Sequence, residues 1–179
     1  MSDIAAWHDY FVTVAQVSAT LAGLLFVGVT ISLNHMLGGR GYLYRAWAAL
    51  FLQFEMLVVA LSGLIPGQPA WLLAAEIIVV ALGVLTAIRV FGHFFPEDEN
   101  SKVLGSKGAR AIRETLIHVA TLLPVVAAIA LIANFGQPFA WLIPAEVISL
   151  YLSFGLAWVF AIEIPRRLEE EKAAKNNPP

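Results

Sequence analysis

The sequence predicts an all-α integral membrane protein with five transmembrane helices. Of its 179 residues, 59% are hydrophobic and only 13% are charged, and the mean hydropathy is +0.77. Soluble domains are about 45–50% apolar and about 25% charged, so this excess is too large for a soluble core. Five apolar stretches each reach the length of about 20 residues that a helix needs to cross the hydrocarbon. Residues 1–179 are therefore expected to form a single transmembrane domain.

The predicted spans cover residues 10–34, 43–65, 70–94, 113–134 and 139–163. A glycine-rich segment at 38–41 ends the first span, because glycine in this number disfavours a helix. Gly-Gln-Pro turns at 67–69 and 136–138 connect the second span to the third and the fourth to the fifth. Residues 95–112 form one longer polar loop, and residues 164–179 form a polar tail that we expect to be cytoplasmic.

The distribution of basic residues predicts the orientation. With five spans, ten of the eleven Lys and Arg residues fall on one side, in or beside the first loop, the long loop and the tail. The opposite side, which holds the N-terminus and both Gly-Gln-Pro turns, has none. Because cytoplasmic loops carry the excess of Lys and Arg, the N-terminus is predicted to lie outside and the C-terminus inside.

A repeated segment marks two helical hairpins. Residues 67–76 and 136–146 both run from a Gly-Gln-Pro turn through a tryptophan to a glutamate five residues later. Trp71 and Trp141 are 70 residues apart, and so are Glu76 and Glu146. The two hairpins would then be a parallel repeat about an axis along the membrane normal. The alternative is that two outer turns share glycine, proline and an interfacial tryptophan for ordinary reasons.

Three acidic residues fall well inside the predicted spans: Glu55, Glu76 and Glu146. An ionisable side chain in the hydrocarbon costs at least about 2.5–3.5 kcal/mol, so it must face protein or water. One hypothesis is that these glutamates form a proton or cation site inside the bundle. The alternative is that each is hydrogen-bonded to a neighbouring helix and only fixes the packing.

Two prolines, Pro124 and Pro144, lie inside predicted helices. Each removes an N–H donor and frees a carbonyl, so each is predicted to kink its helix. Pro144 is two residues before Glu146, and its counterpart in the first copy is Ala74, so the copies are not equivalent there.

The first span carries no charge between Phe11 and Asn34, but polar and small residues share one helical face. They are Thr13, Gln16, Thr20, Gly23, Val27, Thr30 and Asn34. Small residues such as Gly23 let helices approach closely, and polar ones hydrogen-bond across the contact. This helix is therefore either a packing helix, within the bundle or between subunits, or one that lines a pore.

No catalytic motif is present, and we do not expect an enzyme. The chain has no cysteine and four scattered histidines, so the sequence predicts no metal site. The net charge of −2 gives no reason to expect nucleic acid. No cofactor is expected, although a single histidine among His35, His93 and His118 would suffice as an axial haem ligand.

Residues 7–11, Trp-His-Asp-Tyr-Phe, and the small-residue run 19–27 resemble the start of certain small bacterial membrane proteins. Those proteins have no assigned function, and some are labelled modulators of the FtsH protease. The resemblance covers about the first 35 residues. It implies a multi-pass accessory protein of the cell inner membrane, and it transfers no functional residue.

Five helices make a thin bundle that can hardly enclose an aqueous path alone. The buried acids and the polar face on the first helix therefore favour a homo-oligomer in the lipid bilayer. We expect an oligomeric channel or transport-type protein for protons or small cations. Gln16, Thr20 and Thr30 would line its path, and the three glutamates would set its charge. The alternative function is a non-conducting accessory subunit of a larger membrane protein complex.

Overall fold

The computed structural model describes residues 4–36, 40–94, 107–159, 162 and 166, which form helices and short turns with no strand among them. Five helices are long and apolar enough to cross a membrane, which confirms the predicted all-α fold with five candidate spans. Most of the long polar loop and of the polar tail lies outside the described residues. In chain order the helices are η1 (Ile4–Trp7), α1 (His8–Met36), α2 (Arg40–Gly63), α3 (Ala70–Phe94), α4 (Lys107–Ile132), η3 (Pro138–Trp141) and α5 (Leu142–Trp158).

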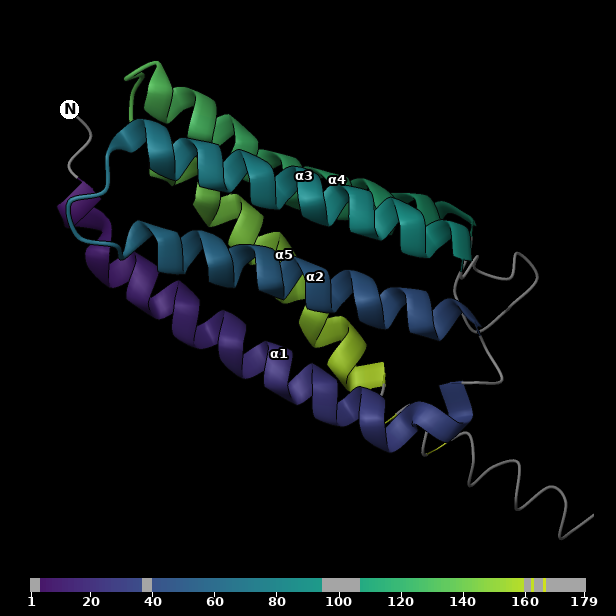
Figure 1. The fold of residues 1–179 in the computed structure, drawn as a ribbon. Helices are drawn as coiled ribbons and strands as arrows, with labels where there is room; N and C mark the ends of the chain where they lie inside the picture. The colour runs from purple at the N-terminus through teal and green to yellow at the C-terminus, as the bar shows by residue number, and fades with distance from the viewer. Residues whose placement is uncertain (1–3, 37–39, 95–106, 160–161, 163–165, 167–179) are drawn as a thin grey trace, which may run out of the picture.

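The five long helices run in alternating directions along one bundle (Figure 1). Both Gly-Gln-Pro turns therefore lie at the end of the bundle where α1 begins. α1 packs along α2, α3 packs on α2 and α4, and α5 crosses the bundle in contact with α1, α2 and α4. α2 is the central helix, because 61% of its most apolar window is buried, against 22% for α1.

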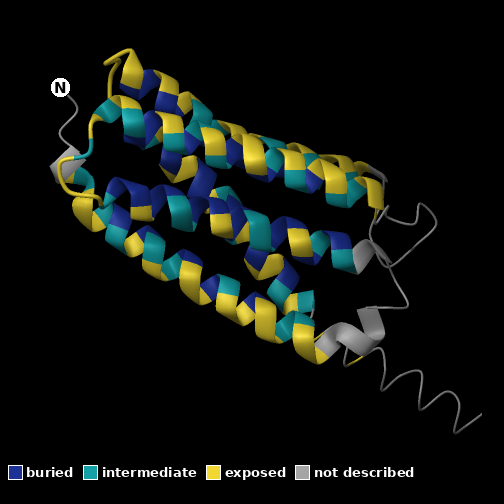
Figure 2. Cartoon of the chain, in the orientation of Figure 1, coloured by how far each residue is buried: buried dark blue, intermediate teal, exposed yellow. Residues whose placement is uncertain are grey.

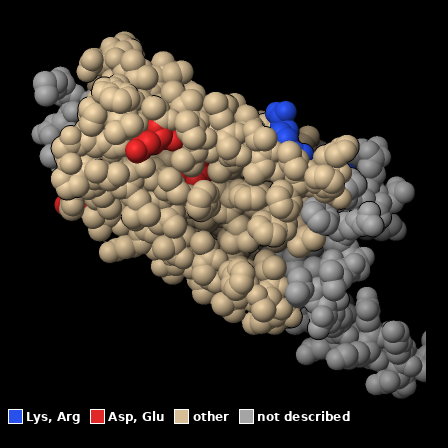
Figure 3. Space-filling model, in the orientation of Figure 1, with Lys and Arg blue, Asp and Glu red and all other residues tan. Residues whose placement is uncertain are grey.

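Buried residues line the faces that the helices turn toward one another, while the outer faces are exposed (Figure 2). The exposed set is largely apolar and includes Trp71, Val79, Phe135 and Tyr151. On the face seen in Figure 3 charged side chains are few, and the Lys and Arg side chains lie toward the end opposite the N-terminus. An apolar belt of this kind is what a bundle surrounded by lipid requires.

The two Gly-Gln-Pro turns share a backbone feature but lead into different helix starts. Gly67 and Gly136 have φ values of +70° and +60°, a left-handed conformation that glycine adopts without steric cost. α3 begins directly after the first turn, whereas the second turn leads into the 3₁₀ helix η3. The second copy has one more residue between proline and tryptophan, and this residue, Phe139, is fully buried. Its ring packs edge to face on Phe11 of α1, with centroids 5.2 Å apart.

The position at which α5 begins corrects the prediction that Pro144 kinks its helix. α5 begins at Leu142, so Pro144 lies in its first turn, where backbone N–H groups have no helical acceptor in any case. No kink acts on Glu146. Pro124, in contrast, lies in the interior of α4, as predicted.

Gly63, the last residue of α2, allows the close contact between α1 and α2. A Cβ at this position would lie 2.7–2.8 Å from three ring carbons of Phe11, which is 1% exposed and cannot move aside. We therefore expect Gly63→Ala to lower the free energy of unfolding by about 1–3 kcal/mol through overpacking. Denaturant unfolding in detergent, followed by far-ultraviolet circular dichroism, measures this change.

Gly83→Ala is the matched control, because a Cβ at Gly83, inside α3, meets nothing within 4 Å. It should stabilise the protein by up to about 1 kcal/mol through helix propensity. Equal effects of the two substitutions would contradict the close α1–α2 contact.

Candidate functional site

A row of polar side chains lies along one buried face of α5. Glu146, Ser149 and Ser153 are spaced i, i+3 and i+7, so they share a face of the helix. Glu146 is 6% exposed and both serines are fully buried. At 1.5 Å per residue the row extends about 10 Å along the helix. We call these three residues the α5 polar row.

At the N-terminal end of the α5 polar row, Glu146 meets α1. The hydroxyl of Ser18, fully buried on α1, donates to Glu146 Oε1 over 3.5 Å. Glu146 Oε2 has no hydrogen-bond partner among the described residues. Tyr10, whose buried hydroxyl also has no partner within the described part of the chain, lies within electrostatic range of Glu146. The carboxyl group thus sits among hydroxyl groups but makes only one long hydrogen bond.

At the other end, the α5 polar row meets α2. The amide of Gln53, fully buried on α2, donates through Nε2 to Ser153 Oγ over 2.9 Å. Gln53 Oε1 and Ser149 Oγ have no hydrogen-bond partner among the residues that the structure describes. The row therefore connects α1 to α2 through side chains that retain unused donors and acceptors.

Glu55 lies on a different side of α2 from Gln53, because residues two apart on a helix do not share a face. It is fully buried, and within the described ranges both of its carboxyl oxygens are without a hydrogen-bond partner. The hydroxyl of Thr121 on α4 faces this carboxyl group but donates to Ile117 O over 3.0 Å. Pro124, one turn further along α4, lacks an N–H and so leaves the carbonyl of Ala120 without its helical donor. Glu55 is the most completely buried acid described in the bundle.

Glu76 does not join Glu146 in space, although the repeat relates the two in sequence. It is half-buried in the second turn of α3, and Gln68 Nε2 from the preceding Gly-Gln-Pro turn donates to its Oε2 over 2.7 Å. α3 packs on α2 and α4, whereas the row on α5 faces α1 and α2. Gln137, the counterpart of Gln68, is exposed. The two glutamates therefore occupy different environments.

The predicted path residues of α1 lie on the outer surface of the chain. Gln16, Thr20 and Thr30 are exposed, and so is Gly23, which was predicted to be a packing residue. The hydroxyl of Thr20 donates to Gln16 O over 2.7 Å, and that of Thr30 donates to Phe26 O over 2.8 Å, so both are satisfied within α1. Within one chain these residues and the α5 polar row do not line a common path, since α1 turns Ser18 to the interior instead.

Near the opposite end of the bundle, His118 is held by two contacts. Arg89 Nε donates to His118 Nε2 over 3.2 Å, and His118 Nδ1 lies 2.7 Å from Glu114 O. Glu114 in turn accepts a hydrogen bond from the Tyr44 hydroxyl over 2.8 Å. His118 is therefore a satisfied polar residue of the α3–α4 contact.

Sequence reasoning missed the partners Ser18, Gln53, Ser149 and Ser153. One signal was present, because the helical spacing of Glu146, Ser149 and Ser153 already places a serine row on the face of the acid. Ser18 and Gln53 have no such signal, since their importance depends on which helices become neighbours.

No protein-family model, curated protein sequence or solved structure matches the chain.

Replacing Glu55 by methionine tests the cost of its burial. Because a buried carboxyl group without hydrogen bonds is destabilising, Glu55→Met should raise the free energy of unfolding by about 1–3 kcal/mol. The matched control is Gln53→Met on the same helix, which removes the bond to Ser153 and should lower stability by about 0.5–2 kcal/mol. Unfolding titrations in detergent measure both variants. A loss of stability in Glu55→Met as large as in Gln53→Met would show that the carboxyl group has a structural partner.

Proposed function

We propose that this chain is a transport-type membrane protein that passes protons or small cations, with Glu146 and Glu55 as the exchanging groups. The observation that carries the proposal is that both carboxyl groups are buried and that each has at least one oxygen without a hydrogen-bond partner among the described residues. Acids kept for packing alone are normally hydrogen-bonded when buried. Acids inside membrane bundles commonly mark substrate or proton paths.

The surroundings of the two acids favour the proton over a larger ion. Hard cations such as Mg²⁺ and Ca²⁺ take about six or more oxygen ligands around one point. Among the described residues, one hydroxyl is bonded to Glu146 and one threonine faces Glu55. One carboxyl group is enough to accept and release a proton. Along the α5 polar row, serine hydroxyls both donate and accept, so they are suited to relay it.

The proposal includes the orientation and repeat predicted from the sequence, within a multi-pass protein of the cell inner membrane. Lys and Arg side chains visible in Figure 3 gather away from the N-terminal end, and both turns contain a left-handed glycine. Since the chain has no cysteine, a single Gln137→Cys variant can be labelled selectively. A membrane-impermeant thiol reagent should modify it from outside intact cells. Protection until the membrane is permeabilised would reverse the orientation.

The exposed polar face of α1 supports association with another helix. Gln16 presents an amide group on this face, and the space at Gly23 is open, since a Cβ there would meet nothing within 4 Å. Because glycine has no side chain, a second helix could approach closely at this position. An amide exposed to lipid is unfavourable, and a facing helix would satisfy it. In the transport proposal that helix is α1 of a second copy. The same face also suits the second candidate function, an accessory subunit that docks on a larger membrane complex.

Proton flux into liposomes tests the transport proposal. A potassium gradient with valinomycin should drive proton uptake by reconstituted protein, read with an enclosed pH-sensitive dye. We expect Glu146→Gln and Glu55→Gln to lower this flux on the order of tenfold or more, because each removes an exchangeable proton. Glu76→Gln is the matched control and should keep the flux within about twofold, since Glu76 is half-buried and bonded to Gln68. Absence of flux in every oligomeric state would favour the accessory function.

Oxidative cross-linking tests the association of α1. Gly23→Cys should form disulfide-linked dimers, because a disulfide requires Cα atoms within about 7 Å of each other. Val79→Cys, at a position that is also exposed but on α3, should remain monomeric on denaturing gels. No cross-link at position 23, together with co-purification of one larger partner, would favour the accessory subunit.

A further inference from the structure

Four aromatic side chains pack together at the end of the bundle where α1 begins. Phe11 of α1 and Phe139 of η3 are buried, and their rings meet edge to face with centroids 5.2 Å apart. The ring of Trp7 lies 5.9 Å from that of Phe139. Tyr10 packs edge to face on both Trp7 and Phe11, at 5.4 Å and 5.7 Å. We call these four residues the aromatic layer. Close-packed rings leave little room for water between them.

Glu146 lies deeper in the bundle than the aromatic layer. The contact of Ser18 with Glu146 joins residues 128 apart in the chain, and the contact of Phe11 with Phe139 has the same offset. α1 and the segment leading through η3 into α5 therefore run parallel here. The contact with Glu146 lies seven residues further along, or about 10 Å at 1.5 Å per residue. Because side chains on a helix lean toward its N-terminus, Glu146 approaches the aromatic layer from the interior.

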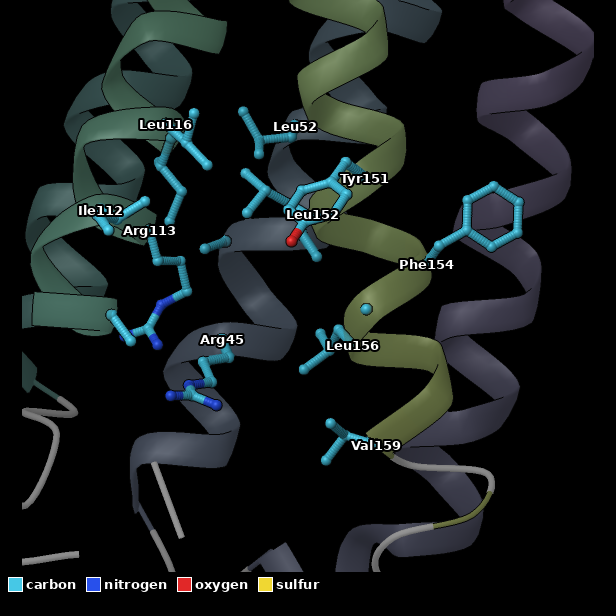
Figure 4. Close-up of a pocket in the computed structure, with 15 residues that line it drawn as sticks. Arg45, Leu52, Ile112, Arg113, Leu116, Tyr151, Leu152, Phe154, Leu156 and Val159 are labelled. Atoms are coloured by element: carbon cyan, nitrogen blue, oxygen red, sulfur yellow. The ribbon is translucent and has the colours of Figure 1, made fainter. Parts of the chain in front are cut away.

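Other surroundings of Glu146 give its carboxyl group no described contact with water. Glu146 is 6% exposed, and its Oε2 atom is buried. A groove between α2, α4 and the C-terminal half of α5 is lined by residues such as Leu52, Ile117 and Leu152, and by neither Glu146 nor any residue of α1 (Figure 4). The α5 polar row leads from Glu146 toward Gln53, away from the aromatic layer. A proton that travels between Glu146 and the water at the end where α1 begins therefore has to pass the aromatic layer.

Tyr10 is the member of the aromatic layer whose side chain can pass a proton on. A phenol hydroxyl both donates and accepts, whereas the indole of Trp7 only donates and the phenylalanine rings do neither. The Tyr10 hydroxyl is buried and has no hydrogen-bond partner among the described residues. It interacts electrostatically with Glu146, but no hydrogen bond joins the two groups. Transfer between them therefore requires a bridging water molecule or a rotation of the glutamate side chain.

We propose that Tyr10 is the relay residue through which Glu146 exchanges its proton with water at the end of the bundle where α1 begins. The proposal rests on the proposed transport function and adds one end of the path to it. The phenol O–H gives its proton to the Glu146 carboxylate, and the same oxygen accepts a proton from the aqueous side. The hydroxyl is thus neutral before and after the transfer, so no phenolate has to be stabilised in the interior, where an unpaired charge is costly.

Removal of the hydroxyl alone tests the relay. Tyr10→Phe keeps the ring contacts with Trp7 and Phe11 and removes the group that transfers the proton. It should lower the proton flux into liposomes roughly tenfold. The matched control is Tyr151→Phe, because Tyr151 lies on the exposed surface of α5 and should leave the flux within about twofold. Circular dichroism and unfolding midpoints confirm that both variants are folded.

A second measurement follows Glu146 itself and does not depend on flux. The infrared carbonyl band of a protonated carboxyl group shifts when deuterium replaces its proton, and the part of this band that Glu146→Gln removes belongs to Glu146. Rapid mixing of the protein with D₂O, at a pH where the carboxyl group is protonated, gives the exchange rate. Tyr10→Phe should slow this exchange roughly tenfold, whereas Tyr151→Phe should not. A tyrosine that only packs against its neighbours would leave the rate unchanged, since phenylalanine keeps those contacts.

The two measurements separate this inference from the transport function. An exchange rate of Glu146 that is unchanged in Tyr10→Phe overturns the relay, even where the wild type conducts protons. Slowing of the same size in Tyr151→Phe overturns it as well. If the wild type shows no flux but Tyr10→Phe slows the exchange, the transport function fails and Tyr10 remains the access of Glu146 to water.

Discussion

Hydrocarbon offers no hydrogen bonds, and this constraint organises the whole bundle. On the outer surface, the hydroxyls of Thr20 and Thr30 are satisfied within their own helix. Other polar groups are turned inward, where Ser18 meets Glu146 and Gln53 meets Ser153. These contacts join α1, α2 and α5, which otherwise present mainly apolar faces. Buried groups that stay unsatisfied, above all the carboxyl of Glu55, are therefore exceptions that require a separate explanation.

α2 gives the bundle its asymmetry. It is the most buried helix, and its faces serve different purposes. Gln53 is directed to α5, Glu55 lies toward Thr121 of α4, and Ala48 and Ala49 face the space between α2, α4 and α5. Because a helix is rigid over this length, a displacement of α2 against α5 would alter the contact between Gln53 and Ser153 and the surroundings of Glu55 together.

The fold followed from the sequence more readily than the site did. Composition and the length of apolar stretches were enough to predict five candidate spans, and the interior position of Pro124 was also correct. The 3₁₀ start of the last helix was not foreseen, because it accompanies the contact of Phe139 with Phe11, which depends on how the helices pack. The environments of the glutamates were not foreseen either. Depth in a membrane can be counted along the chain, but the neighbour that a side chain meets depends on the rotation of its helix and on helix order. For this reason Glu76 and Glu146, at similar depth, have different partners.

The additional residue in the second turn has a consequence for how such a protein diversifies. With 3.6 residues per turn, one residue corresponds to about 100° of rotation around the helix axis. Glu146 follows its turn proline by one residue more than Glu76 does, so the same side chain is presented at another azimuth. An additional residue between the turn and the helix can thus transfer an acid from a half-buried to a buried position without altering any residue of the helix. The number of residues between turn and helix, and not only the identity of the side chains, therefore decides which polar groups face the interior of the bundle.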